Sequence, residues 1–332
     1  MRAVVLVGGF GTRLRPLTLS VPKPMLPIGH VPMIARLLDR LGRGGVTEVV
    51  LALGFRPEPF IEAFPDGRCG DVALVYAVEP EPLDTAGAIK FAAEFAGIDD
   101  TFVVANGDVM TDLDVAALVE AHRSFGAEAT LHLIGVDDPS AFGVVDLAED
   151  GSVRAFVEKP IPGTEPSNLI NAGTYVFEPS VLARIPAATK VSVERDTFQR
   201  IVADGGLYGV ATDDYWIDAG VPTLYRAANL DLLDGKRRTE RCDAIAPSAE
   251  VASDAVVRRS IVGDRVRIAA GASVVDSVLL PGATVAAGAT VERSLVMGSV
   301  GRDAVVRDSM IGADGHVADG DTLLDATVPA AE

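Results

Sequence analysis

Cysteine, basic charge and long apolar runs are all scarce in this sequence. Its 332 residues include only two cysteines, Cys69 and Cys242, which stand far apart in the chain. Two such thiols cannot build a disulfide framework and form no metal-ligand spacing, so we expect both to be reduced and structural. The apolar run Ala3–Val7 is too short to span a membrane and does not have the form of a signal peptide. These absences favour a cytoplasmic protein with no membrane partner.

The chain is strongly acidic. Lys and Arg number 29 against 47 Asp and Glu, which gives a formal net charge of −18. Nucleic-acid-binding proteins normally carry a basic patch, so this balance argues against a nucleic-acid partner. It also makes an anionic membrane surface an unfavourable one. A site that binds phosphate must therefore concentrate the few Arg and Lys residues locally.

Residues 1–232 alternate short β-branched runs with helical periods. We expect strands at Ala3–Val7, Glu48–Leu53, Asp71–Ala77 and Thr101–Ala105, and helices at Met33–Gly44, Thr85–Phe95 and Val115–Phe125. This alternation predicts βαβ units, and hence an α/β domain with a Rossmann-like, mostly parallel sheet. Ligands of such sheets bind beyond the carboxyl ends of the strands, so we expect the chemistry in the turns after Val7 and Ala105.

A different sequence pattern begins after a charged linker at residues 233–245. From Val251 to Leu323 an aliphatic residue recurs mostly every five or six positions, with Ala and Gly between. No α-helix has this period, whereas a left-handed parallel β-helix of hexapeptide repeats places one aliphatic residue of each short strand inside. We therefore predict such a domain, of about four coils, at residues 246–332. The flat, repetitive sides of a solenoid suit it either to cap the catalytic domain or to mediate self-association, and we expect a homo-oligomer.

The first turn carries a phosphate-binding pattern. Gly8, Gly9 and Gly11 follow the first strand, Arg13 comes directly after them, and Lys23 stands between two prolines. Glycines let the backbone turn tightly and present its N–H groups to a phosphate, while the cations supply charge. The glycine spacing is neither the dinucleotide fingerprint nor the Walker A pattern.

The full string is more specific than its glycines. Gly-Gly-Phe-Gly-Thr-Arg-Leu-Arg-Pro-Leu-Thr at residues 8–18, followed by Pro-Lys-Pro at 22–24, closely resembles the signature of the sugar-1-phosphate nucleotidyltransferases. The resemblance covers the catalytic half, with further motifs at residues 82–87, 106–108, 142–144, 157–160, 171–173 and 216–220. Among the branches of this family, the mannose-1-phosphate guanylyltransferases are the most similar.

This resemblance implies transfer of a nucleotidyl group from an NTP to a sugar 1-phosphate, with release of pyrophosphate and with Mg²⁺ as cofactor. GTP and mannose 1-phosphate are the favoured substrates. Two alternatives stay open: an enzyme acting on glucose 1-phosphate with dTTP, UTP or ATP, and a catalytically silent relative that binds an NDP-sugar and regulates a partner.

The resemblance also implies roles for residues. Arg13, Lys23, Asp108 and Lys159 are the expected catalytic residues, and Asp108 and Asp218 the expected Mg²⁺ ligands. Two carboxylates and phosphate oxygens form the hard oxygen set that Mg²⁺ prefers. The expected sugar-phosphate site comprises Gly143, Glu158, Lys159, Asn171 and Gly173. The expected nucleotide site comprises Val7, Gly8, Gly9, Gly11, Thr12, Arg13, Lys23, Leu83, Asp84, Thr85, Ala86, Gly87, Asn106 and Gly107.

Asp84 departs from the pattern of the guanylyltransferases, which usually have glycine at this position. Its carboxylate either accepts hydrogen bonds from the N1–H and N2 amine of guanine or caps the helix that opens at Thr85. The departure bears on which base is bound and not on the reaction.

Overall fold

The structure, a computed structural model, describes residues 1–9, 11–54, 57–237 and 240–330. Contacts between residues divide the chain into two compact units. The first unit contains Met1–Gly9 and Ile34–Trp216, and the second contains Phe10–Met33 and Ile217–Glu332. Phe10 of the glycine turn and Arg238 and Thr239 of the charged connection lie outside the described residues. The domain boundaries at residues 232 and 246 stay a prediction from the change in sequence pattern.

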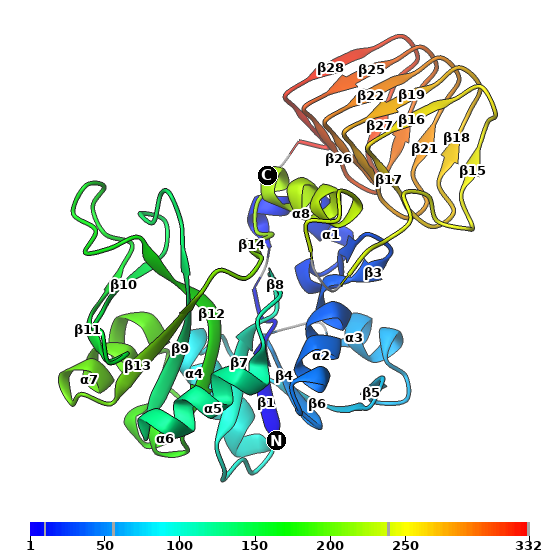
Figure 1. Cartoon of the computed structure of the whole chain (residues 1–332). Helices are drawn as coiled ribbons and strands as arrows, with labels where there is room; N and C mark the ends of the chain where they lie inside the picture. Colours follow the sequence, from blue (N-terminus) through cyan, green and yellow to red (C-terminus); the bar gives the residue numbers. More distant parts are fainter. Residues whose placement is uncertain (10, 55–56, 238–239, 331–332) are drawn as a thin grey trace. The chain divides into compact units, whose positions relative to one another are not determined.

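A mixed sheet forms the centre of the first unit (Figure 1). Its strands are β1 (Arg2–Leu6), β4 (Glu48–Leu53), β5 (Arg68–Cys69), β6 (Val72–Val78), β7 (Phe102–Asn106), β9 (Ala129–Gly135), β10 (Gly143–Leu147), β11 (Val153–Glu158), β12 (Leu169–Phe177) and β13 (Leu207–Thr212). The main order is β11-β10-β12-β7-β1-β4-β6-β5, and β9 joins β12 and β13. Strands β7, β1, β4 and β6 are parallel, as predicted, whereas β12 runs antiparallel to β7, β9 and β10.

The helices of this part of the chain connect the strands. They are α2 (Met33–Arg43), α3 (Glu58–Ala63), α4 (Asp84–Phe95), α5 (Val115–Phe125), α6 (Ser180–Arg184) and α7 (Phe198–Ala203), preceded by the π-helix η3 (Val193–Thr197), and a short strand β8 (Val109–Thr111) follows β7. The seven elements predicted from the sequence are all present, each within one residue at either end. Local signals account for this agreement: Asp114 caps α5 by accepting a hydrogen bond from the Ala117 N–H, and Gly126 ends the helix with a φ of 60°.

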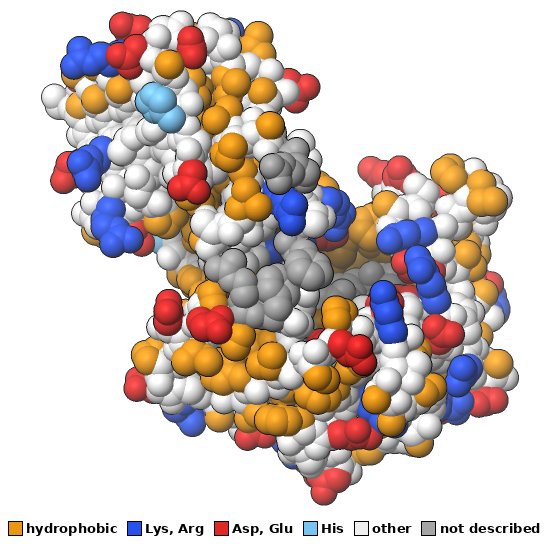
Figure 2. All heavy atoms as spheres, turned by 180° about the vertical axis from the view of Figure 1, so that it is seen from behind, with side chains coloured by type: hydrophobic (Ala, Val, Ile, Leu, Met, Phe, Trp, Pro, Cys, Tyr) orange, Lys and Arg blue, Asp and Glu red, His pale blue; other side chains and the backbone are white. Residues whose placement is uncertain are grey.

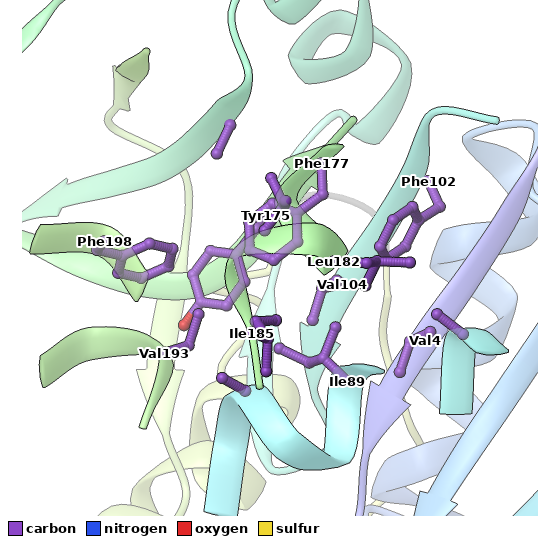
Figure 3. Packing of buried hydrophobic residues seen from close by; sticks show 14 of the residues in the cluster. Val4, Ile89, Phe102, Val104, Tyr175, Phe177, Leu182, Ile185, Val193 and Phe198 are labelled. Carbon is purple, nitrogen blue, oxygen red and sulfur yellow. The ribbon is translucent and has the colours of Figure 1, made fainter. Parts of the chain in front are cut away.

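Aromatic side chains fill the core on one face of the sheet (Figure 3). Tyr175 and Phe177 of β12 stack with ring centroids 5.6 Å apart, and Phe198 of α7 meets the Tyr175 ring edge-on at 5.2 Å. Phe102 of β7 meets Phe177 in the same way at 5.9 Å. These rings are fully buried, so β12 is held against the parallel strands by apolar burial as well as by its hydrogen bonds.

A buried histidine makes the stability of this unit depend on pH. His132 of β9 has no exposed surface, and burial lowers the pKa of its imidazole from 6.5 to about 4. Its Nε2 is hydrogen bonded to Thr212 Oγ1 at 2.9 Å, whereas its Nδ1 has no hydrogen-bond partner among the described residues. Protonation would therefore leave a buried N–H without an acceptor.

We expect this histidine to destabilise the fold in mild acid. Between pH 6.5 and about 4 the unfolded chain binds a proton that the folded chain does not, so the free energy of unfolding falls as the pH falls. The loss due to His132 should be roughly 2 kcal/mol between about pH 7.5 and about pH 5. Urea unfolding of the wild type and of His132→Gln at both pH values measures it. An equal decrease in the free energy of unfolding of the two proteins would contradict the prediction.

The second unit contains a parallel β-helix of three five-stranded sheets (Figure 1). The first sheet consists of β15 (Glu250–Val251), β18 (Arg267–Ile268), β21 (Thr284–Val285), β24 (Ser299–Val300) and β27 (His316–Val317). The second consists of β16 (Val256–Arg258), β19 (Ser273–Val275), β22 (Thr290–Glu292), β25 (Val305–Arg307) and β28 (Thr322–Leu324). The third consists of β17 (Ile261–Val262), β20 (Val278–Leu279), β23 (Leu295–Val296), β26 (Met310–Ile311) and β29 (Thr327–Val328). Each of the three sheets has five strands, so the predicted number of about four coils was too low.

Stacked serines keep the coils in register. Ser260 Oγ accepts a hydrogen bond from the Ser277 N–H, Ser277 Oγ from the Ser294 N–H, and Ser294 Oγ from the Ser309 N–H, at 3.0–3.1 Å. All four serines are buried. Since a buried hydroxyl is costly without a partner, this ladder favours the one register in which every serine meets the next.

The same unit contains the chain segment after the glycine turn. Its elements are η1 (Thr12–Leu14), α1 (Leu17–Ser20), η2 (Lys23–Met25), β2 (Pro27–Ile28) and β3 (Val31–Pro32), with α8 (Pro222–Leu233) and the end of β14 (Trp216–Asp218). Buried Asn229 of α8 accepts a hydrogen bond from the Gly29 N–H at 2.8 Å, and the Tyr225 hydroxyl donates to Pro27 O. These contacts join the segment to α8. No helix in the described part of the chain is long and apolar enough to cross a membrane.

Candidate active site

Charge must be concentrated locally, because the protein as a whole is acidic. On the face shown in Figure 2, Lys and Arg side chains are interspersed with Asp and Glu. The predicted site residues belong to both units. Gly8, Gly9, the turn at residues 82–87 that we expect to hold the base, and the sugar-phosphate residues are in the first, and Arg13, Lys23 and Asp218 are in the second.

The glycines at the carboxyl ends of β1 and β7 allow backbones to approach closely. A methyl carbon on Gly8 would lie 3.1 Å from the backbone nitrogen of Gly54, and one on Gly107 would lie 2.8 Å from Leu6 O. Gly107 N–H donates to Leu6 O at 2.9 Å. Val7 is buried between these turns, and Gly9 is exposed. A side chain at Gly8 or Gly107 would therefore separate the ends of neighbouring strands. These strand ends are where the sequence predicts the nucleotide site.

Asn106 of the predicted nucleotide site and Gly173 of the predicted sugar-phosphate site lie together. Gly173 has a φ of +77°, and a methyl carbon on it would lie 2.7 Å from Asn106 Nδ2. Asn171 Oδ1 accepts a hydrogen bond from the Gly173 N–H, and its Nδ2 donates to the Tyr175 hydroxyl. A left-handed φ next to a side-chain amide requires glycine here. The bend of β12 thus joins the two predicted sites.

Glu158 is the last residue of strand β11, and Lys159 follows it directly. Glu158 pairs in register with Gly143 of β10, and a methyl carbon on Gly143 would lie 3.0 Å from Glu158 Oε2. Burial and the negative charge of Glu194 raise the pKa of the Glu158 carboxyl. Lys159 Nζ lies 3.7 Å from Glu158 Oε1, and 61% of the Lys159 side chain is exposed. An exposed ammonium beside a half-buried carboxylate is suited to a ligand with both phosphate and hydroxyl groups.

The predicted base-binding turn is the start of α4. Asp84 is exposed and has a φ of +61°, a conformation in which glycine is favoured, and its Oδ1 accepts a hydrogen bond from the Thr85 N–H at 2.8 Å. A capping side chain would instead accept from an N–H two or three residues further on, and among the described residues α4 has no such side-chain cap. Both alternatives for Asp84, capping and recognition of guanine, stay predictions.

The rest of this turn is bonded within the protein. The N–H groups of Ala86 and Gly87 donate to Val191 O, at 2.9 and 3.3 Å. Thr85 Oγ1 donates to Glu194 Oε2 at 2.9 Å and accepts from the Val193 N–H at 2.8 Å. Two of the predicted nucleotide-binding amides are therefore already satisfied, and the turn is held rigidly by the segment before α7.

Sequence reasoning missed Glu79, a buried carboxyl beside this turn. Glu79 is 8% exposed, its Oε2 accepts a hydrogen bond from the Leu83 N–H at 2.9 Å, and a methyl carbon on Gly8 would lie 3.6 Å from its Oε1. Burial raises the pKa of this carboxyl. Glu79 thus links the glycine turn to the base-binding turn. Its position directly after strand β6 was the available signal, because ligands bind at the carboxyl ends of such strands.

In the second unit three charged side chains converge on Gly220. A methyl carbon on Gly220 would lie 2.7 Å from Arg13 Nη2, 2.7 Å from Asp218 Oδ1 and 3.0 Å from Lys23 Nζ. Lys23 is 7% exposed, and its Nζ lies 3.7 Å from Asp218 Oδ1. This is the local concentration of positive charge that the acidic composition required. Gly220 was part of a sequence motif but had no predicted role, because only the folded chain shows what surrounds it.

The segment that carries these cations is tightly packed. Gly11 has a φ of +60°, and a methyl carbon on it would lie 3.0 Å from both Lys23 Cβ and Thr18 Cγ2. Thr18 Oγ1 donates to Gly11 O at 2.9 Å. Thr12 and Arg13 are exposed on η1. The glycine therefore lets Lys23 pack against the turn that holds Arg13.

The two predicted metal ligands belong to different units. Asp108 is half-buried in the turn between β7 and β8, and Asp218 is in the second unit. Among the described residues, no group of three or more His, Cys, Asp or Glu side chains is arranged to hold a metal ion. The donor chemistry nevertheless fits Mg²⁺, which proteins usually bind through one or two carboxylates together with substrate phosphates.

Two family models and many curated proteins match this chain. A model of the nucleotidyl transferase family matches residues 2–235, and a model of the GlmU-like C-terminal hexapeptide family matches residues 227–324. The mannose-1-phosphate guanylyltransferase of Mycobacterium tuberculosis is 40% identical over 304 residues, which cover 88% of this chain and 83% of that protein. Mannose-1-phosphate guanylyltransferase 1 of Arabidopsis thaliana is 36% identical over 316 residues, which cover 94% of this chain and 86% of that protein.

A solved structure is also similar to this chain. The crystal structure of HddC from Yersinia pseudotuberculosis complexed with GMP-PN has a TM-score of 0.59 and 31% identity with this chain, and the match covers 69% of this chain and 97% of that one. All of the predicted site residues fall within the region that the first family model matches. Residues 227–324 resemble a GlmU-like hexapeptide domain, and the chain belongs to the nucleotidyl transferase family.

Proposed function

We propose that this enzyme transfers the guanylyl group of GTP to mannose 1-phosphate, giving GDP-mannose and pyrophosphate. The observation that carries the proposal is the convergence of Arg13 Nη2, Lys23 Nζ and Asp218 Oδ1 on Gly220. Two cations beside a carboxylate suit a triphosphate bound with a metal ion. The relatives named mannose-1-phosphate guanylyltransferase support the choice of substrates.

The reaction is an in-line displacement. An oxygen of the sugar phosphate attacks the α-phosphorus of GTP and forms a new P–O bond. The bond from the α-phosphorus to the oxygen that bridges to the β-phosphorus breaks, and pyrophosphate leaves with the electron pair. Catalysis then consists mainly of positioning and of charge neutralisation. Arg13 and Lys23 would neutralise the triphosphate, and Lys159 the sugar phosphate.

The remaining residues would bind and orient. Glu158 and Asn171 would accept and donate hydrogen bonds to the sugar, and the turns at Gly8 and Gly107 would present backbone N–H groups to phosphate. Asp108 and Asp218 would hold Mg²⁺, which would supply positive charge to the phosphate oxygens. A homo-oligomer in the cytoplasm stays a prediction from the sequence.

Glu79 supports the choice of guanine. The Watson–Crick edge of guanine offers two N–H donors side by side, which one carboxylate can accept together. Adenine and cytosine instead place a ring nitrogen acceptor on that edge, which a carboxylate would repel. Glu79 already fixes the Leu83 backbone of the base-binding turn, so its second oxygen is a rigid acceptor.

A substrate grid tests the proposal. Pyrophosphate release is measured with Mg²⁺ for GTP, dTTP, UTP, ATP and CTP against the 1-phosphates of mannose, glucose, N-acetylglucosamine and galactose. We expect turnover with GTP and mannose 1-phosphate. Turnover confined to glucose 1-phosphate with another nucleotide would replace the substrates and keep the reaction. If no pair reacts while an NDP-sugar binds, the protein is a silent relative.

Glu79→Gln should reduce the preference for GTP. The amide cannot accept two hydrogen bonds as the carboxylate does, and a hydrogen bond to a charged group contributes about 1.5–3 kcal/mol. We therefore expect kcat/KM for GTP relative to ATP to fall roughly 10- to 100-fold. Asp84→Asn makes the same acid-to-amide change in the same turn, and since the Asp84 contact is a local one to Thr85, it should change the ratio by less than about 2-fold. The reverse pattern would assign base recognition to Asp84.

A further inference from the structure

One glycine of the β-helix lies directly against the segment that carries Arg13 and Lys23. Gly312 follows strand β26 and is buried. A methyl carbon on it would lie 2.7 Å from Pro16 Cβ and 2.9 Å from Pro16 Cγ. Carbon atoms that are not bonded to each other do not approach so closely, so the proline ring occupies the space that any other side chain at position 312 would need.

The contact recurs one coil away. The residues that directly follow β17, β20, β23 and β26 form one column, and their N–H groups donate to the next coil at 2.7–2.8 Å. This column consists of Gly263, Leu280, Met297 and Gly312. Ser20 Oγ donates to Met297 Sδ at 3.5 Å. Helix α1 therefore contacts two successive coils, with Pro16 at its start on Gly312 and Ser20 at its end on Met297.

Packing continues from α1 to the cations. Thr18 of α1 is hydrogen bonded to Gly11 O, and Gly11 lies between Thr18 and Lys23, as described above. Lys23 Nζ and Arg13 Nη2 then meet at Gly220. The result is an unbroken series of contacts, all within the second unit, from the β-helix coil at Gly312 to the site proposed for the triphosphate.

We propose that Gly312 is a positioning residue for Arg13 and Lys23, so that this coil of the β-helix sets where the two cations stand. The inference rests on the proposed function for the role of the cations. Gly312 touches no substrate and acts only through Pro16. The backbone at Gly312 is held by the hydrogen bond of its N–H to Val328 O at 2.7 Å. An added methyl group would therefore displace the proline and α1 rather than the coil.

The test is Gly312→Ala, with Gly263→Ala as the matched control. A methyl group at Gly263, in the same column, would lie 2.9 Å from Leu279 O and 3.1 Å from Pro281 N. It therefore crowds the backbone of the β-helix without reaching Pro16, and controls for disturbance of the coil itself. We expect kcat/KM for GTP to fall roughly 10- to 100-fold in Gly312→Ala, because small misplacements of positioning groups have effects of this size. KM for the sugar 1-phosphate should change little, since Glu158, Lys159 and Asn171 lie in the first unit. Gly263→Ala should keep the kinetic constants of the wild type.

A second substitution shows whether the effect passes through Pro16. Pro16→Gly removes the two atoms that the new methyl group would strike. In a double-mutant cycle, adding Gly312→Ala to Pro16→Gly should then lower kcat/KM by less than about 3-fold. The same relief should restore soluble, folded protein if Gly312→Ala alone does not fold. Equal losses in both backgrounds, or a double variant that stays unfolded, would overturn the proposal.

Hydrogen exchange separates this inference from the proposed function. Backbone amides of residues 11–20 should exchange faster in Gly312→Ala than in the wild type, without any substrate, and should not do so in Gly263→Ala. If no substrate pair of the grid reacts, the proposed function is wrong, but hydrogen exchange still tests whether Gly312 positions residues 11–20. If the wild type is active, and both hydrogen exchange and kinetic constants are unchanged in Gly312→Ala, the positioning role of Gly312 is wrong and the proposed function stands.

Discussion

Asp108→Asn should release pyrophosphate at least about a thousand times more slowly than the wild type, because loss of roughly 4 kcal/mol of charge stabilisation lowers a rate by about that factor. Asp108 is half-buried in the turn after β7, beside the predicted nucleotide residues Asn106 and Gly107. Asparagine has nearly the shape of aspartate, so the turn should keep its fold, but the amide lacks the anionic oxygen that a magnesium ligand needs. Substrate affinity should be kept in part.

The control for this variant is Asp114→Asn. Asp114 is six positions away and caps α5 through the Ala117 N–H, a task that asparagine performs equally well. Its rate and stability should match those of the wild type. Chelation of the metal by EDTA should also stop the wild-type enzyme, and added Mg²⁺ should restore it. An unchanged rate in Asp108→Asn would exclude Asp108 as a metal ligand, and turnover in EDTA would remove the metal from the reaction.

Gly220→Ala is the second change with a large expected effect. The new methyl group would lie 2.7 Å from Arg13 Nη2 and Asp218 Oδ1 and 3.0 Å from Lys23 Nζ. All three atoms lie at the ends of side chains, which can change conformation without unfolding the protein. The three charged groups would then no longer lie close together. We expect kcat/KM for GTP to fall about 100-fold or more, with little change in the melting temperature.

Gly135→Ala provides the comparison. A methyl group there would meet only Asn168 Nδ2, at an ordinary contact distance of 3.6 Å. This variant should keep wild-type activity and stability. A large loss of stability in Gly220→Ala would mean that the glycine is needed for folding. Wild-type kinetics in Gly220→Ala would show that the convergence of the three charges does not matter for catalysis.

Local patterns in the sequence predicted much of this protein. The strand at Arg2–Leu6 and the helix at Val115–Phe125 were found because buried runs and helical periods depend on neighbouring residues. The β-helix was found because its period repeats in every coil. The family was found because its motifs at residues 8–18 and 22–24 are continuous in the chain.

Antiparallel strand β12 was not predicted, although it completes the sheet at the site. Its long apolar run pairs with β7, β9 and β10, which come from three different parts of the chain. Sequence periodicity shows that such a run is buried but not which strand lies beside it. The bend at Gly173, which brings Asn106 against β12, therefore emerged only from the structure.

The sequence by itself determined the two kinds of domain, the glycine turn and the charged residues available for phosphate. Only the tertiary structure decided that Arg13, Lys23 and Asp218 meet at Gly220, and that Pro16 lies against Gly312. It also decided that Glu79 lies between the glycine turn and the predicted base-binding turn. Residues 16 and 312 are separated by nearly the whole chain, and no local period connects them. Close packing between such distant residues depends on the complete fold. Whether a position requires glycine is therefore known only when the atoms that surround it in the folded chain are known.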